Sequence, residues 1–195
     1  MTSHSSETFK RFISKGVFPY QWAFTLLCPL RNIFLSPKRL MERLEIQEDA
    51  TVLEVGPGPG YFSVPIAKKL TRGKLVLADI QPEMLKYAKK RLTKKGLTNV
   101  EYYQCDGNTF DFPDDHFDVV FLVTVLGEVA NKQEYMAEFF RILKNGGILS
   151  ISELAGDPDK MSTHEARELA TNAGFSFDKI YGKERNYTAN FRKIL

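Results

Sequence analysis

Glycine at every second position, directly after a short apolar run, constrains this chain more than any other feature. Residues 52–55 read VLEV and residues 56–60 read GPGPG. An amphipathic stretch begins at Tyr61, so this order predicts a strand, a glycine turn and a helix. Glycine adopts positive φ and, because it has no Cβ, lets a ligand lie against the backbone. Since α/β sheets bind ligands at the carboxyl ends of their strands, we expect a ligand to bind at this loop.

The residues of the loop indicate which ligand fits. A dinucleotide fingerprint has the spacing G-x-G-x-x-G and turns its N–H groups toward a pyrophosphate. Here the spacing is G-x-G-x-G, and Pro57 and Pro59 have no N–H to donate. Glu54 would also repel a diphosphate, whereas a carboxylate suits a ligand with positive groups, such as an amino acid or a sulfonium. A tight structural turn that binds nothing is the alternative interpretation.

A second acid follows at the end of the next predicted strand. Residues 74–79 (KLVLAD) form an apolar run that ends in Asp79, 19 positions after Gly60. Nucleotide-binding α/β folds present a carboxylate to ribose hydroxyls at about this distance. The alternative role of Asp79 is to cap the helix that we expect to begin at Pro82, and the two roles can coexist.

A third acid, Asp106, follows the third predicted strand at residues 100–104 and precedes Gly107. An isolated Asp-Gly pair is commonly a simple turn. Three acids at the carboxyl ends of successive strands, Glu54, Asp79 and Asp106, indicate one shared site more strongly than three separate turns.

Strands and helices alternate along the rest of the chain. We predict further helices at residues 37–44, 61–70, 82–95, 131–143 and 163–173, and further strands at residues 117–123, 147–152, 175–181 and 187–193. The fourth and fifth strands are apolar throughout, as in a parallel sheet buried on both faces. The last two have no helix between them and predict a terminal antiparallel pair. The predicted fold class is α/β, with a Rossmann-like, seven-stranded, mostly parallel sheet, an antiparallel last strand and helices on both faces.

The glycine loop and three later motifs resemble those of class I S-adenosylmethionine-dependent methyltransferases. The later motifs are residues 79–85 (DIQPEML), 117–120 (FDVV) and 143–149 (LKNGGIL). The resemblance covers residues 36–195 and, within the superfamily, points to small type 11 and quinone-methyltransferase-like members. It implies S-adenosylmethionine as the cofactor and a methyltransferase domain at residues 36–195, preceded by an N-terminal extension at residues 1–35.

The same resemblance implies roles for individual residues. Glu54 would face the ammonium group of the cofactor, Asp79 the ribose hydroxyls and Asp106 the adenine amine. Ile80 would lie against the adenine, and the backbone near Val123 would lie beside the methionine part. The full set of implied cofactor-binding residues is Glu54, Gly56, Pro57, Gly58, Gly60, Asp79, Ile80, Asp106, Gly107 and Val123.

The absence of certain motifs narrows the range of possible methyl acceptors. Residues 123–128 read VTVLGE where enzymes that methylate exocyclic base amines carry Asn/Asp-Pro-Pro-Tyr/Phe, so nucleic acid is disfavoured. Two cysteines are too few for arsenic methylation, and we expect no metal site. The remaining expectation is a small methyl acceptor, either apolar or aromatic. Catalytic residues are not assigned, and the candidate proton acceptors are Glu128, Glu153 and Tyr20.

Composition sets the remaining limits. The net charge of +3 and pI of about 8.7 are too mild to indicate nucleic-acid binding. Residues 86–95 hold six basic side chains, for which a solvated helix face is the plain interpretation and an anionic partner the rarer one. Two cysteines form no disulfide framework, which fits a reducing cytoplasm. The oligomeric state is not predicted.

The N-terminal residues 9–35 are too rich in aromatic side chains for a solvated tail. We expect this segment to pack on the core or to cover the cofactor as a lid. Prolines and a glutamine interrupt its uncharged run, which is also too short to span a bilayer. We therefore expect neither a processed signal peptide nor a membrane span.

Two other functions stay open. An NAD(P)-binding Rossmann oxidoreductase would share the sheet, although the prolines, the glycine spacing and the antiparallel end pair argue against it. A cofactor-binding protein without catalytic turnover is not excluded by fold alone.

Overall fold

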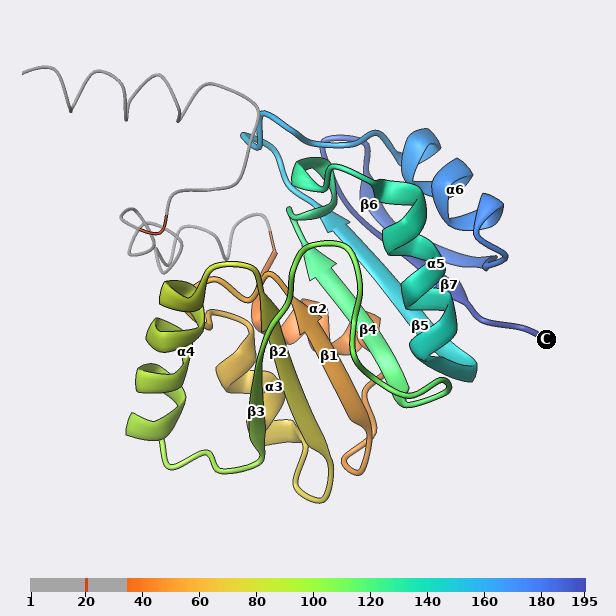
Figure 1. Cartoon of the computed structure of the whole chain (residues 1–195). Coiled ribbons are helices and arrows are strands. Elements are labelled where there is room, and N and C mark those ends of the chain that lie inside the picture. The colour runs from red at the N-terminus through yellow and green to blue at the C-terminus, as the bar shows by residue number, and fades with distance from the viewer. Residues whose placement is uncertain (1–19, 21–34) are drawn as a thin grey trace, which may run out of the picture.

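Seven strands form one sheet in the order β3-β2-β1-β4-β5-β7-β6, with helices packed on both of its faces (Figure 1). The computed structural model describes Tyr20 and residues 35–195. In chain order the elements are α2 (Pro37–Leu44), β1 (Thr51–Val55), α3 (Ser63–Lys69), β2 (Lys74–Asp79), α4 (Pro82–Lys94), β3 (Val100–Gln104), β4 (Phe117–Val123), η3 (Leu126–Glu128), α5 (Lys132–Ile142), β5 (Leu143–Glu153), α6 (Thr163–Asn172), β6 (Ser176–Lys183) and β7 (Asn186–Arg192).

The strands β3, β2, β1, β4 and β5 run parallel to one another. Val55, at the end of β1, lies level with Ala78 on one side and Leu122 on the other. The carboxyl ends of these strands therefore meet at one edge of the sheet. β7 runs antiparallel to both of its neighbours, β5 and β6. The predicted seven-stranded sheet with an antiparallel last strand is confirmed.

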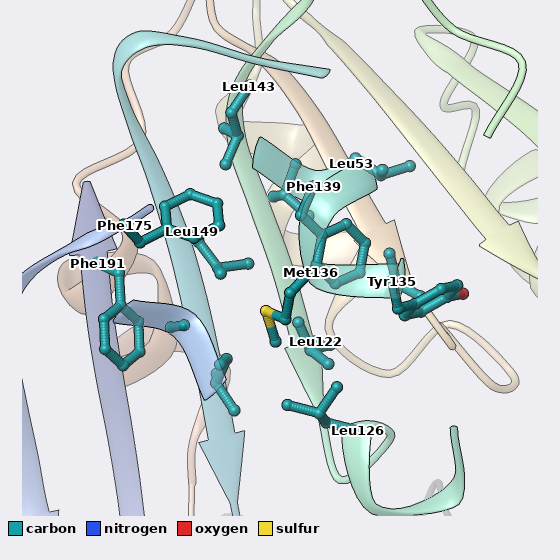
Figure 2. Packing of buried hydrophobic residues seen from close by; sticks show 14 of the residues in the cluster. Leu53, Leu122, Leu126, Tyr135, Met136, Phe139, Leu143, Leu149, Phe175 and Phe191 are labelled. Atoms are coloured by element: carbon teal, nitrogen blue, oxygen red, sulfur yellow. The ribbon is translucent and has the colours of Figure 1, made fainter. Parts of the chain in front are cut away.

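Two apolar cores cover the two faces of the sheet. α2, α3 and α4 belong to one core, which contains Val52 and Ile66. α5 and α6 belong to the other core, where Met136 and Phe139 pack beside Leu53 (Figure 2). Val52 and Leu53 point to opposite faces because side chains alternate along a strand. The prediction of helices on both faces is confirmed.

The strands β2, β3 and β4 span the predicted residues, whereas two other elements begin more than one residue away from the predicted start. α3 begins at Ser63 rather than at residue 61, because the turn of the glycine loop continues through Gly60 at φ +81°. β5 begins at Leu143 rather than at residue 147, because Leu143 pairs with Phe117 ahead of a shift in register. Gly146, at φ +79°, lies within this irregular stretch.

Most of the N-terminal predictions lie outside the described residues. The lid expected from the aromatic segment belongs to residues 1–19 and 21–34, so it stays a prediction. Leu35 is fully buried, and the Ser36 side chain caps α2 by accepting a hydrogen bond from the Arg39 N–H. Within the described ranges, no helix has the length and apolar character that crossing a membrane requires.

Candidate functional site

The glycine loop after β1 has a backbone that favours glycine at three positions. Gly56, Gly58 and Gly60 have φ values of +64°, +53° and +81°. The Gly56 N–H donates to the Ala78 carbonyl at 2.8 Å, which fixes the loop to the end of β2. A Cβ on Gly56 would lie 2.4 Å from Cγ2 of Val125, so the loop also packs directly under the residues that follow β4.

Replacing Gly56 by alanine is expected to lower the free energy of unfolding by about 2–4 kcal/mol. Left-handed φ costs a non-glycine residue about 1–2 kcal/mol, and overpacking against a branched side chain costs about 1–3 kcal/mol. Urea unfolding of Gly56→Ala, Val125→Ala and the double variant measures the two parts. In the double variant, Val125→Ala should remove the steric clash with the new Cβ and leave only the cost of the left-handed φ. A Gly56→Ala protein as stable as wild type would contradict the packing described.

Glu54, the penultimate residue of β1, is a buried carboxylic acid without a full set of partners. It is 3% exposed, and its Oε2 has no hydrogen-bond partner in the described structure. Burial, with a smaller contribution from the charge of Asp79, raises the pKa of Glu54 to about 8, and the Ser63 hydroxyl acts in the opposite direction. Within residues 35–195, Ser63 Oγ itself makes no hydrogen bond of ordinary geometry. A cationic group at this position would stabilise the ionised carboxylate.

Asp79 closes β2 beside the glycine loop. Its Oδ1 accepts a hydrogen bond from the Gln81 N–H at 2.9 Å. Burial raises its pKa to about 6, and hydrogen bonds from the backbone N–H groups of Gln81, Gly58 and Ile80 oppose that rise. The N-cap residue of α4 is Gln81, so Asp79 supports the turn before the helix rather than capping it. Because the carboxylate contacts both the loop of β1 and the end of β2, it lies where the two predicted motifs meet.

An exposed apolar side chain, that of Ile80, directly follows Asp79 and lies beside Gly107. Ile80 is 39% exposed, and a Cβ on Gly107 would lie 3.4 Å from its Cγ2. Gly107 has φ +88°, and the preceding Asp106 accepts hydrogen bonds from the N–H groups of Asn108 and Thr109 through Oδ1. These bonds lower the pKa of Asp106. Asp106 therefore does form the turn expected of an Asp-Gly pair, and it stays ionised at the same edge as Ile80.

The end of β4 contains a strained residue that the sequence did not reveal. Thr124 has φ +55°, donates its hydroxyl hydrogen to the Val123 carbonyl at 2.7 Å and donates its N–H to the Ser152 carbonyl. Left-handed threonine is uncommon because its branched Cβ clashes with the backbone, and such strain is frequent at ligand sites. Ser63 and Val125 are likewise contacts of the site that no sequence signal identified.

Glu153 ends β5, next to the end of β4. It is 1% exposed, and neither of its carboxylate oxygens has a hydrogen-bond partner among the residues described. Burial raises its pKa to about 8; the negative charges of Asp157 and Glu128 raise it and the positive charge of Lys160 lowers it. Tyr187 of β7 lies opposite Glu153 in the sheet, and its hydroxyl donates to the Met161 and Ser162 carbonyls instead.

The three candidate proton acceptors thus lie in different settings. Glu153 is buried with unpartnered oxygens, and Glu128 is half-buried at the end of η3. Tyr20 is half-buried, and the residues on either side of it are outside the described part. Glu54, Asp79 and Asp106 do converge on one edge, as predicted. Glu153 lies at the same edge, two strands away from β1, beyond β4.

These residues fit an adenosine derivative with positive groups. The unpartnered Glu54 oxygen suits an ammonium, Asp79 suits a pair of hydroxyls, and exposed Ile80 beside Gly107 suits a flat ring. The described residues hold no group of three His, Cys, Asp or Glu side chains that would bind a metal. The sheet and this edge define an S-adenosylmethionine-dependent methyltransferase by class.

Comparison with known proteins gives the family. Residues 46–192 match the family model described as a methyltransferase domain. The chain therefore belongs to the methyltransferase-domain family, and S-adenosylmethionine is its cofactor. The sequence resemblance to class I methyltransferases of the quinone-methyltransferase-like kind is confirmed.

Curated relatives include ubiquinone/menaquinone biosynthesis C-methyltransferases UbiE. The chain is 36% identical over 134 residues to the protein of Pseudomonas putida (strain GB-1), a match that covers 68% of this chain and 51% of the relative. It is 31% identical over 120 residues to that of Francisella tularensis subsp. novicida (strain U112), covering 60% and 48%. The chain spans about half the length of the curated relatives it matches.

Solved structures share the fold. A SAM dependent methyltransferase from Aquifex aeolicus has a TM-score of 0.85 at 23% identity, covering 91% of this chain and 100% of that chain. The [4+2]-cyclase SpnF has a TM-score of 0.70 at 17% identity, covering 82% and 80%. At these identities the likeness concerns the fold and not the reaction.

Proposed function

We propose that this chain transfers a methyl group from S-adenosylmethionine to a small, apolar acceptor that carries a hydroxyl on an aromatic or quinol ring. The observation that carries the proposal is Glu153, a buried carboxyl whose two oxygens have no hydrogen-bond partner among the described residues. It lies at the same edge as the glycine loop, and β4 separates its strand from β1. A group of this kind requires a hydrogen-bonding ligand or a proton to be stable. A hydroxylated ring supplies a hydroxyl hydrogen, and the UbiE relatives are named as C-methyltransferases of quinone biosynthesis.

For the cofactor, we propose the roles that the sequence resemblance implied. Glu54 pairs with the ammonium, Asp79 accepts from the ribose hydroxyls, and Asp106 accepts from the adenine amine. Ile80 and Gly107 flank the adenine, and the backbone at Val123 lies beside the methionine part. The glycine loop, comprising Gly56, Pro57, Gly58 and Gly60, allows close approach of the ligand.

For the reaction, the bound cofactor supplies a methyl group that its sulfonium makes electrophilic. The protein must hold the acceptor in line behind that methyl, and such positioning contributes about 7–11 kcal/mol. In this proposal Glu153 takes the hydroxyl proton of the acceptor, which makes the oxygen or the adjoining ring carbon nucleophilic. The cofactor, held by Glu54, Asp79 and Asp106, would supply the methyl group to this oxygen or carbon, and at a ring carbon the hydrogen that the methyl replaces would leave as a proton.

The proposal is tested with the full chain and S-adenosylmethionine labelled in its methyl group. The acceptors offered are 1,4-naphthohydroquinone, 1,4-benzohydroquinone and 1-naphthol under reducing conditions, with transfer RNA as a comparison and Asp79→Ala as the cofactor-site control. We expect label in at least one small acceptor and none in RNA. Tight binding of S-adenosylhomocysteine without label in any acceptor would favour a non-catalytic cofactor-binding protein.

The affinity for S-adenosylhomocysteine is expected to rise with pH, by up to tenfold per pH unit, between about pH 6 and pH 8. Glu54 holds a proton below its pKa of about 8, and pairing with the ligand ammonium requires that proton to leave. The affinity should level off above pH 8, and Glu54→Gln should remove most of this dependence. Calorimetric titration at pH 6, 7 and 8 measures it, and equal wild-type affinities at pH 6 and 8 would contradict the pairing.

Two further predictions from the sequence belong to this proposal. We infer that residues 36–195 are the methyltransferase domain and that residues 1–35 are an aromatic-rich extension, which packs on the core or covers the site as a lid. We also infer a cytoplasmic location, which the unpaired, buried thiol of Cys105 supports. An NAD(P)-dependent oxidoreductase is the competing function, and it would bind NAD at this edge instead of S-adenosylhomocysteine.

A further inference from the structure

The exposed face of α4 carries a concentration of positive charge that the site does not use. α4 and its C-cap residue contain six basic residues and one acidic residue, a net charge of +5, whereas the whole chain carries +3. The other residues together are therefore net acidic, by two charges. The basic residues are Lys86, Lys89, Lys90, Arg91, Lys94 and Lys95, and the acidic one is Glu83.

We call the five lysines of this group the α4 basic face. All five are exposed, and none of them makes an ion pair within the part of the chain that the structure describes. Neighbouring basic residues behave differently. Arg72 pairs with Glu48 at 3.5 Å, and Lys74 pairs with Glu101 at 2.8 Å. Lys69 also lies 3.9 Å from Glu48. Exposed lysines elsewhere, such as Lys38, Lys68 and Lys183, also make no ion pair among the described residues, and Lys89 lies over the Tyr102 ring, 5.6 Å from its centroid. The feature specific to α4 is therefore the concentration of such lysines on one helix.

This arrangement opposes the stability of the helix. Lys86, Lys90 and Lys94 follow one another at intervals of four, so they form a row along one side of α4. Like charges at this spacing destabilise a helix by about 0.2–0.5 kcal/mol per pair. Tyr87, 44% exposed, lies beside the row. A negatively charged surface would remove the repulsion, and a tyrosine with an apolar ring and a polar hydroxyl suits the headgroup region of a membrane.

We propose that the α4 basic face binds an anionic lipid surface. Clusters of four to eight lysines or arginines on one helix are attracted to anionic lipid headgroups, each residue near the surface contributing to the attraction. A flat surface can contact every residue of one exposed helix face at the same time. Nucleic acid would need further basic or stacking groups beside the helix, and the net acidic remainder of the chain disfavours it. This surface does not depend on the identity of the methyl acceptor.

Vesicle flotation of the full chain tests the proposal. The vesicles contain phosphatidylcholine alone or with 30% phosphatidylglycerol, at 50 and 300 mM NaCl, and the variants are K86Q/K90Q/K94Q and a control, K38Q/K68Q/K183Q. The control removes the same charge from exposed lysines elsewhere. We expect binding to the anionic vesicles at low salt, loss of binding at high salt, and a partition coefficient roughly 100-fold lower in the α4 variant. The control variant should bind nearly as well as wild type.

The other outcomes overturn the proposal. Wild-type protein that stays unbound, or that binds neutral and anionic vesicles equally, has no anionic lipid site. Equal losses in the α4 variant and the control show a non-specific charge effect. Binding of a labelled 30-nucleotide single strand that competes with vesicles and is lost in the α4 variant would assign the face to nucleic acid. Circular dichroism and S-adenosylhomocysteine affinity report folding, since α4 lysines do not contact the proposed site.

Discussion

Replacing Glu153 by glutamine is expected to lower kcat for methyl transfer by about 100- to 10,000-fold, the range that a positioned general base contributes. Glutamine keeps the size of the side chain but cannot accept the proton of the acceptor hydroxyl. In wild type, kcat should rise with pH up to the pKa of about 8, because the base acts in its ionised form. Steady-state kinetics from pH 6 to 9 with the acceptor found by the labelling screen measures both effects.

The controls separate catalysis from folding. Glu128→Gln changes a neighbouring carboxylate that influences Glu153 and should alter kcat less than tenfold.

The stability of Glu153→Gln provides an independent readout. Because the native pKa of Glu153 is raised from 4.5 to about 8, native wild-type protein loses stability as pH rises through this window. The variant should therefore gain stability relative to wild type from pH 5 to pH 8.5, on the order of 3 kcal/mol. Retained kcat would show that Glu153 is not the base.

Replacing Asp79 by alanine is expected to weaken the binding of S-adenosylhomocysteine by at least about 100-fold. In the proposed site its carboxylate accepts hydrogen bonds from two ribose hydroxyls, and bonds to a charged group contribute about 1.5–3 kcal/mol each. Calorimetry at pH 8 measures the loss, since Asp79 with its pKa of about 6 is then ionised in the free protein.

Asp79→Asn serves as the matched control. Its amide oxygen can still accept from the Gln81 N–H, which preserves the turn before α4, but it lacks the charge and one acceptor oxygen. We expect an affinity between those of wild type and Asp79→Ala, with both variants unfolding within 2 kcal/mol of wild type, about the effect of one lost turn contact. An unchanged affinity in Asp79→Ala would contradict the ribose assignment.

The parts of the fold that sequence predicted best are those governed by local patterns. β2 and β4 follow from apolar runs between turn residues, and the convergence of Glu54, Asp79 and Asp106 follows because parallel strands end at the same edge. The start of β5 at Leu143 did not follow, because it depends on pairing with Phe117 across a register shift. Such pairing is a tertiary interaction.

The site itself was predictable in outline and not in detail. The acids could be named from their spacing, but the raised pKa values of Glu54 and Asp79 depend on burial, which no local pattern reports for a charged residue. Thr124 in a left-handed conformation contradicts the preference of threonine for extended backbone, so only the assembled structure reveals it. Among the three candidate proton acceptors, Glu153 is distinguished by two buried oxygens without a hydrogen-bond partner in the described part of the chain, a property that only the assembled structure reveals.

The central claim is that the carboxylate-lined edge binds a cationic adenosine thioether and not a dinucleotide. Calorimetric titration of the wild-type chain at pH 8 with S-adenosylhomocysteine and, separately, with NAD tests it most directly. We expect saturable, one-to-one binding of S-adenosylhomocysteine at micromolar concentrations and no heat from NAD. Saturable binding of NAD, with none of S-adenosylhomocysteine at millimolar concentration, would contradict the claim.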